Sequence, residues 1–134
     1  MSKRPRFRFI INPTSGPSSK VDVAARIKLH LDHQKFEHDI VYTDYAGHAP
    51  VLAREAAAQG CEVVVAVGGD GTVNEVAQGL LHTDTVLGII PRGSGNGLAR
   101  HLQVPLTVDA AIRFLNQGHR SQIDSGIING RPFF

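Results

Sequence analysis

The sequence predicts an α/β fold with three layers, in which helices cover both faces of a parallel sheet. Three observations lead to this prediction. Apolar or β-branched runs of strand length alternate with segments of helical periodicity. The middle runs, over residues 62–67 and 86–90, are continuously apolar, which is typical of strands buried on both faces. The 134 residues, 42% of them hydrophobic, are enough for one domain with its own core.

The first strand is predicted over residues 6–12, where arginine and phenylalanine alternate before a short apolar run. The prolines and glycine that follow, at residues 13–17, predict a loop. Ser19 and Asp22 resemble a helix-capping pair, and apolar residues then recur at helical spacing to about His33. We therefore expect a helix between this loop and the next strand.

The second strand and helix are predicted between residues 37 and 59. β-branched and aromatic residues indicate a strand over residues 37–43. The alanine-rich segment 51–59 predicts a helix that has Pro50 in its first turn and Gly60 at its stop position.

The most apolar strands come next. The run over residues 62–67 ends in a glycine-rich loop, and helical periodicity resumes at Thr72. The run over residues 86–90 ends at Pro91, and a second glycine-rich loop leads into a short helix over residues 98–102.

The last part of the chain predicts an amphipathic helix over residues 108–117 and a strand over residues 122–127. Asn129-Gly130 is a strong signal for a hairpin turn, but only four residues follow it. We therefore expect half a hairpin at this point.

The composition excludes several classes of protein. A lone cysteine, Cys61, closes no intrachain disulfide and builds no cysteine-based zinc site, which indicates a reducing compartment. No stretch approaches about 18 consecutive apolar residues, so we expect at most a peripheral contact with membranes. The net charge of +2 is too small to predict nucleic acid as a partner. We expect a cytoplasmic protein, and the oligomeric state stays open, with a homodimer among the alternatives.

Glycine-rich loops follow three of the predicted strands, at residues 12–17, 68–72 and 92–97. The carboxyl ends of parallel strands share one edge of the sheet, and ligands bind beyond that edge. We therefore expect the three loops to converge on one site. The loop at residues 68–72 joins a buried strand to a helix, where free N–H groups and the helix dipole favour an anion such as phosphate.

Asp70 stands in the middle of this predicted phosphate loop. A carboxylate about 4 Å from a phosphate charge is repelled by roughly 4 kcal/mol at an effective dielectric constant near 20. The attraction between an anion and a helix N-terminus is worth only about 0.3–1 kcal/mol. A cation such as Mg²⁺ between the two groups removes this conflict. The alternative is that Asp70 is a turn or N-cap residue that bonds its own backbone.

The common nucleotide motifs are absent. The chain contains no Gly-x-x-x-x-Gly-Lys-Ser/Thr loop, and the Gly-x-Gly pairs at 69–71 and 93–95 lack the third small residue of a dinucleotide fingerprint. A phosphate site without a loop lysine must depend on backbone amides, a metal ion, and Arg92 or Arg100.

Two segments resemble one known family. Residues 68–76 (GGDGTVNEV) and 87–100 (LGIIPRGSGNGLAR) are similar to the catalytic domain of the diacylglycerol kinase family, which includes sphingosine and ceramide kinases and bacterial lipid kinases. Residues 12–16 (NPTSG) and 123–126 (IDSG) resemble further family motifs in the same order. Residues 68–72 (GGDGT) alone also resemble NAD kinases and 6-phosphofructokinases. The segment 91–100 favours the lipid kinases.

This resemblance implies an N-terminal ATP-binding domain over residues 1–126, followed at 127–134 by the start of a β-rich second domain. It implies ATP and Mg²⁺ as ligands, with Asp70 and Asp124 as catalytic and metal-binding residues. The implied ATP site contains Asn12, Pro13, Thr14, Ser15, Gly16, Thr43, Gly68, Gly69, Asp70, Gly71, Thr72, Val73, Asn74, Glu75, Gly93, Ser94 and Asn96.

The implied reaction is in-line transfer of the ATP γ-phosphoryl group to a lipid hydroxyl. The acceptor pocket and the catalytic base are expected beyond Phe134, so the isolated chain is expected to be inactive. The family commonly has aspartate where Gly97 stands, which places this sequence closer to sphingosine and ceramide kinases and their bacterial relatives. Two alternatives stay open: an NAD-kinase-like nucleotide kinase, and a non-catalytic nucleotide-binding module.

Overall fold

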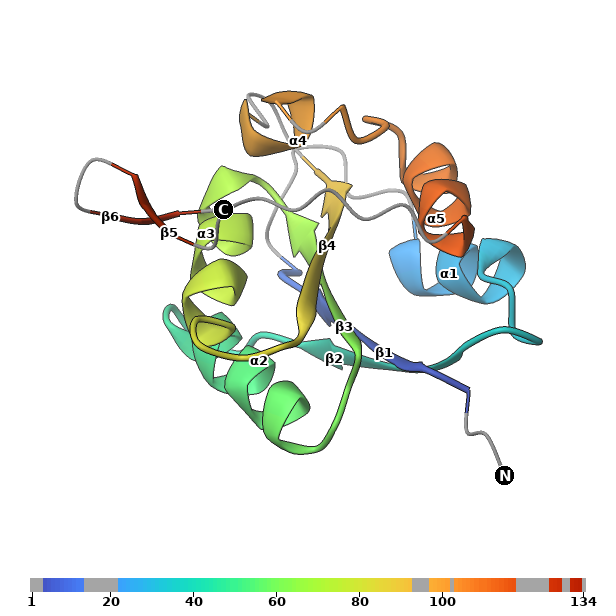
Figure 1. Ribbon diagram of the computed structural model, residues 1–134. Coiled ribbons are helices and arrows are strands. Elements are labelled where there is room, and N and C mark those ends of the chain that lie inside the picture. Colours follow the sequence, from blue (N-terminus) through green and yellow to red (C-terminus); the bar gives the residue numbers. More distant parts are fainter. Residues whose placement is uncertain are drawn as a thin grey trace.

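A four-stranded parallel sheet forms the centre of the protein (Figure 1). The structure is a computed structural model that describes residues 4–13, 22–92, 97–101, 103–117, 126–128 and 131–133. The strands are β1 (Arg6–Ile11), β2 (Glu37–Tyr42), β3 (Val63–Gly68) and β4 (Val86–Pro91), in the order β2-β1-β3-β4.

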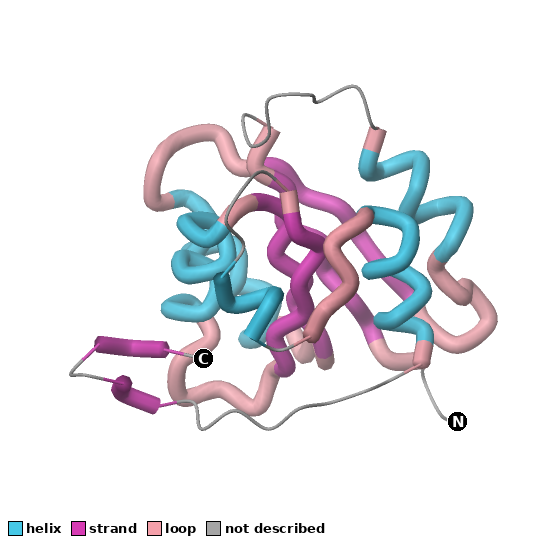
Figure 2. Tube along the Cα trace, turned by 90° about the horizontal axis from the view of Figure 1, so that it is seen from above, coloured by secondary structure: helices cyan, strands magenta, loops and turns pink. Residues whose placement is uncertain are grey.

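Helices cover both faces of this sheet, which confirms the predicted fold class (Figure 2). Helices α1 (Val23–His30) and α5 (Val108–Asn116) lie on one face. Helices α2 (His48–Ala58) and α3 (Asp70–Gly79) lie on the other, together with the short α4 (Gly97–His101).

Alternate residues of the central strands build two separate cores. Phe9 and Val65 pack with Ile27 of α1, whereas Ile10 and Val64 pack with α2 and α3 on the opposite face. Phe9, Ile10 and Ile27 have no exposed surface. Each such side chain contributes roughly 1.5–3 kcal/mol through burial, so the two cores hold the strands in register.

The strand order creates a switch point between β1 and β3. The chain passes from β1 to β2 through α1 on one face, and from β2 to β3 through α2 on the other. The loops after β1 and β3 therefore lead to opposite faces, and in open α/β sheets ligands bind beyond the carboxyl ends of strands at such a point.

Several boundaries differ from the sequence predictions. Helix α2 begins at His48, two residues before the predicted first-turn residue Pro50, because Gly47 adopts φ +87° and turns the chain into the helix early. Helix α3 begins at Asp70 instead of Thr72, because Gly71 does not interrupt its first turn.

The final strand is the largest difference. Strand β5 (Gly126–Ile128) pairs antiparallel with β6 (Arg131–Phe133), and the two form a sheet of their own. The expectation of half a hairpin was therefore wrong, since Arg131–Phe133 are enough for a second strand. Strand β6 lies beside α3 (Figure 1). The division into domains at residue 126 stays a prediction.

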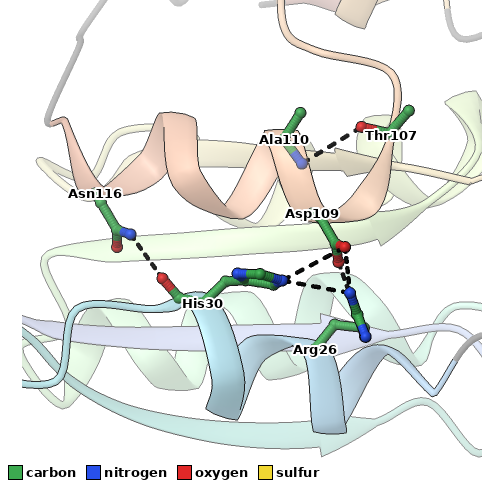
Figure 3. A network of polar contacts seen from close by, with 6 residues as sticks. All are labelled: Arg26, His30, Thr107, Asp109, Ala110 and Asn116. Carbon is green, nitrogen blue, oxygen red and sulfur yellow. Dashed lines mark hydrogen bonds and ion pairs between the residues drawn. The ribbon is translucent and has the colours of Figure 1, made fainter.

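A polar network joins α1 to α5, which lie on the same face of the sheet (Figure 3). Arg26 donates from Nε to Asp109 Oδ1 at 2.7 Å, and its Nη2 contacts the other carboxylate oxygen. His30 Nε2 lies 3.4 Å from Asp109 Oδ2, and Asn116 Nδ2 donates to the His30 carbonyl at 2.7 Å. Arg26 holds the pKa of Asp109 at about 2, below its usual value of 3.8.

Asp109→Asn is expected to change the acid stability of the protein. A depressed carboxyl pKa in the folded state contributes stability above the unfolded pKa, and this contribution is lost as the pH falls from about 4 to about 2. The variant should therefore show a shallower loss of stability over this interval than the unaltered chain. Urea unfolding at a series of pH values measures the slope. The same slope in both proteins would contradict the effect.

Candidate functional site

One residue separates the carboxyl end of β3 from the start of α3. This residue, Gly69, is the N-cap, with φ −86° and ψ −168°, and it has no side chain to cap the helix. Asp70 is the first helical residue and is exposed. The N–H groups of the first turn thus face the edge of the sheet without a side-chain cap, which is the geometry that favours an anion.

Gly68 is required by the close approach of α3 to β3. A Cβ at this position would lie 2.6 Å from Thr72 Oγ1 and 2.7 Å from Thr72 Cβ. Position 68 therefore has no room for a side chain. Among the described glycines only Gly47 and Gly60 have positive φ, so the glycines at 68, 69 and 71 do not adopt this conformation.

The end of β1 is tied to the first turn of α3. Asn12 Nδ2 donates to Thr72 Oγ1 at 3.3 Å, and the Asn12 N–H donates to the Val67 carbonyl at 3.2 Å. Thr72 is buried and stands in the first turn of α3, whose N-cap is Gly69. The bond across the switch point joins two predicted site residues that are 60 positions apart.

The end of β4 completes the same arrangement. The Arg92 N–H donates to the Gly68 carbonyl at 2.8 Å. The Gly97 N–H, at the start of α4, donates to Asp70 Oδ2 at 3.1 Å. Asp70 is therefore not an N-cap residue bonded to its own turn, and its carboxylate is oriented by a backbone group 27 positions away.

The other predicted ATP-site residues in the described part of the chain lie on α3 or near the carboxyl end of β1. The Thr43 N–H donates to the Ile11 carbonyl at 3.0 Å, which places Thr43 beside the end of β1. Val73 packs in the core, and its N–H donates to the Gly69 carbonyl at 3.1 Å. Asn74 is exposed, Glu75 is half-buried, and Pro13 is exposed just after β1.

Seven predicted site residues lie outside the described residues, and their roles stay predictions. They are Thr14, Ser15, Gly16, Gly93, Ser94, Asn96 and Asp124. Sequence reasoning missed the bond from Gly97 to Asp70. No sequence signal indicated it, because the donor is a backbone N–H and a Cβ at Gly97 would lie 3.9 Å from Asp70 Oδ2, so the contact does not require glycine.

Comparison with known proteins identifies the family. Residues 6–128 match the diacylglycerol kinase catalytic domain. The chain belongs to the diacylglycerol kinase catalytic-domain family. It is 36% identical over 132 residues to a diacylglycerol kinase of Staphylococcus saprophyticus, covering 97% of this chain and 43% of that protein. It is 33% identical to one of Staphylococcus aureus, again over 97% of this chain and 42% of the relative.

A solved structure of a diacylglycerol kinase from Bacillus anthracis has the same fold. The TM-score is 0.72 at 28% sequence identity, over 89% of this chain and 44% of that one. This member of the diacylglycerol kinase family thus spans less than half the length of the relatives it matches. Across the described residues, no helix has the length and apolar character needed to cross a bilayer.

Proposed function

We propose that this chain is the nucleotide-binding half of an ATP- and Mg²⁺-dependent lipid kinase, which transfers the γ-phosphoryl group of ATP to a lipid hydroxyl. One observation carries the proposal: the N-terminus of α3 lies at the switch point, with the Asp70 carboxylate held beside it by Gly97. The family supplies the reaction class.

Phosphate and Asp70 need a cation between them. Their repulsion is about 4 kcal/mol at 4 Å and an effective dielectric constant near 20, against about 0.3–1 kcal/mol of attraction from the α3 terminus. Asp70 is exposed and its Oδ2 accepts one hydrogen bond, so the carboxylate keeps capacity for a metal ion.

The donor set fits Mg²⁺ bound together with a nucleotide. The described residues contain no group of three histidine, cysteine or acidic side chains that could hold a metal by themselves. Mg²⁺ is commonly held by one or two carboxylates, with phosphate oxygens and water completing its coordination. Asp70 would hold it here, with Asp124 as the second proposed carboxylate. When bound, the ion neutralises charge on the phosphates.

The chain's own residues position the nucleotide. The backbone N–H groups at the start of α3 bind phosphate oxygens, and the bond between Asn12 and Thr72 keeps this turn against β1. Gly68 allows the close contact on which that position depends. Because phosphoryl transfer relies mainly on positioning and charge stabilisation, these are the contributions that this half must make.

The acceptor is a hydroxyl of a diacylglycerol or a sphingoid-type lipid. The names of the relatives favour diacylglycerol. Gly97, where aspartate is common in the family, favours a sphingoid-type acceptor. Either lipid resides in a membrane, so we propose a cytoplasmic enzyme that contacts the membrane surface peripherally.

Nucleotide binding and transfer test this proposal separately. Calorimetry should show that the 134-residue chain binds ATP and that Mg²⁺ tightens the binding. With labelled ATP, we expect little transfer by this chain alone to diacylglycerol, ceramide, sphingosine or NAD. The same assay on the chain extended through its natural reading frame should label a lipid.

Three outcomes would change the proposal. If label appeared in NAD alone, the proposed reaction would be that of a nucleotide kinase and not that of a lipid kinase. ATP binding without any transfer by the extended protein would favour a non-catalytic module. Robust lipid phosphorylation by the 134 residues would show that no second half is needed.

A further inference from the structure

One guanidinium nitrogen of Arg92 is buried. This atom, Nη1, is closed off from solvent and has no hydrogen-bond partner among the described residues. A buried donor without a partner is costly, and more so on a charged group. Native proteins retain such groups mainly where a ligand or another functional demand compensates for them.

The backbone of Arg92 belongs to the candidate site. Its N–H donates to the Gly68 carbonyl at 2.8 Å, and its own carbonyl oxygen would lie 3.3 Å from a Cβ at Gly69. Arg92 is thus packed against the residues that join β3 to α3. The Arg92 side chain therefore starts next to the turn at which the phosphates are proposed to bind.

The charge balance of the loops favours an anionic partner for this group. Residues 68–76 carry Asp70 and Glu75 and no basic residue, and no lysine occurs at 91–101. Arg92 and Arg100 are the arginines of residues 91–101. Arg100 is exposed on α4 and already has an interaction within the chain. Arg92 is therefore the better placed cation for the negative charge that a nucleotide brings.

We infer that Arg92 binds a phosphate group of the nucleotide through its guanidinium and takes the part that a loop lysine has in other phosphate sites. The inference rests on the proposed function, because it needs ATP at this edge of the sheet. Arginine suits the role, since its planar fork matches phosphate oxygens and its charge persists at all working pH values.

The test compares Arg92→Met with the unaltered 134-residue chain, in affinity and in stability. Methionine keeps the length of the side chain and removes every donor. Calorimetry with Mg²⁺ should show a loss of about 10- to 100-fold in the affinity for ATP, the usual effect of a charge-assisted hydrogen bond. Inorganic tripolyphosphate, which lacks the nucleoside, should show a similar loss. The affinity for adenosine, which lacks phosphate, should change by less than about twofold.

Stability separates a ligand-binding role from a structural one. If the buried nitrogen has no partner in the free protein, Arg92→Met leaves the melting temperature of the ligand-free chain unchanged or raises it. A lower melting temperature together with weaker binding of adenosine would show that Arg92 supports the fold, and it would overturn the inference. Arg92→Lys, which keeps the charge but not the planar fork, should recover part of the ATP affinity.

Arg54→Met is the matched control. Arg54 is exposed on α2, outside the loops of the site, and its loss changes the net charge by the same amount. It should leave the ATP affinity within about twofold. Equal ATP affinity in Arg92→Met and the unaltered chain would overturn the role of Arg92 and leave the proposed function standing. No ATP binding by the unaltered chain would overturn both.

Discussion

Asp70→Asn is expected to abolish the tightening of ATP binding by Mg²⁺. Asparagine has nearly the same shape, and its amide oxygen can accept the hydrogen bond from the Gly97 N–H. The variant therefore keeps the local geometry and removes the charge that holds the cation. With one charge interaction worth about 4 kcal/mol at 4 Å and an effective dielectric constant near 20, the affinity for ATP with Mg²⁺ should fall about tenfold or more.

Calorimetry with and without Mg²⁺ measures this effect. Without the metal, Asp70→Asn should bind ATP at least as well as the unaltered chain, because the repulsion between carboxylate and phosphate is gone. The stability should change by only about 0.3–1 kcal/mol, the usual contribution of an acidic residue in the first turn of a helix.

Asp84→Asn is the control for this variant. Asp84 is exposed in the turn before β4, at the opposite edge of the sheet from the candidate site. Its replacement removes the same charge and should leave the response to Mg²⁺ intact. An unchanged response in Asp70→Asn would refute the metal-binding role of Asp70.

Gly79→Ala is expected to destabilise the protein by about 1–3 kcal/mol. A Cβ at Gly79 would lie 2.4 Å from the Pro50 carbonyl oxygen, 2.9 Å from Pro50 Cα and 2.9 Å from Ala53 Cβ. Two of these contacts are with backbone atoms of α2, so no side-chain rotation relieves them. Helices α2 and α3 must move apart, which has the usual cost of overpacking.

A second glycine of the same helix provides the opposite expectation. At Gly71 a new Cβ meets no atom within 4 Å, so Gly71→Ala should raise the stability by up to about 1 kcal/mol through helix propensity. Thermal unfolding followed by circular dichroism measures both changes, at about 2–8 °C per kcal/mol. A stabilised Gly79→Ala variant would mean that α2 and α3 are not packed as closely as described.

The type and order of the elements could be predicted from the sequence because they depend on neighbours along the chain. The all-buried strand β3 has an unbroken apolar sequence, and Asp22 caps α1 by accepting a bond from the Ala25 N–H. These patterns are local, and they were sufficient for the fold class. The start of α3 was missed because Gly69 at the N-cap and Gly71 in the first turn carry no helical signal.

The candidate site could be predicted only in part. The convergence of the loops followed from the geometry of parallel sheets, and the bonds from Asn12 to Thr72 and from Arg92 to Gly68 confirm it for the described residues. The partner of the Asp70 carboxylate could not be predicted, because Gly97 approaches it only after β3 and β4 have paired. The lack of a hydrogen-bond partner for Arg92 Nη1 among the described residues is likewise a property of the packed chain.

The sequence by itself determined that this protein is an α/β domain of the diacylglycerol kinase family with glycine-rich loops at one edge of its sheet. Periodicity, apolar runs and motif order are properties of adjacent residues, so they need no knowledge of the fold. Only the tertiary structure decided the strand order β2-β1-β3-β4, the contact that requires Gly68, and the neighbours of Asp70 and Arg92. These depend on which distant apolar faces pack together, and packing brings together backbone groups that no local pattern connects.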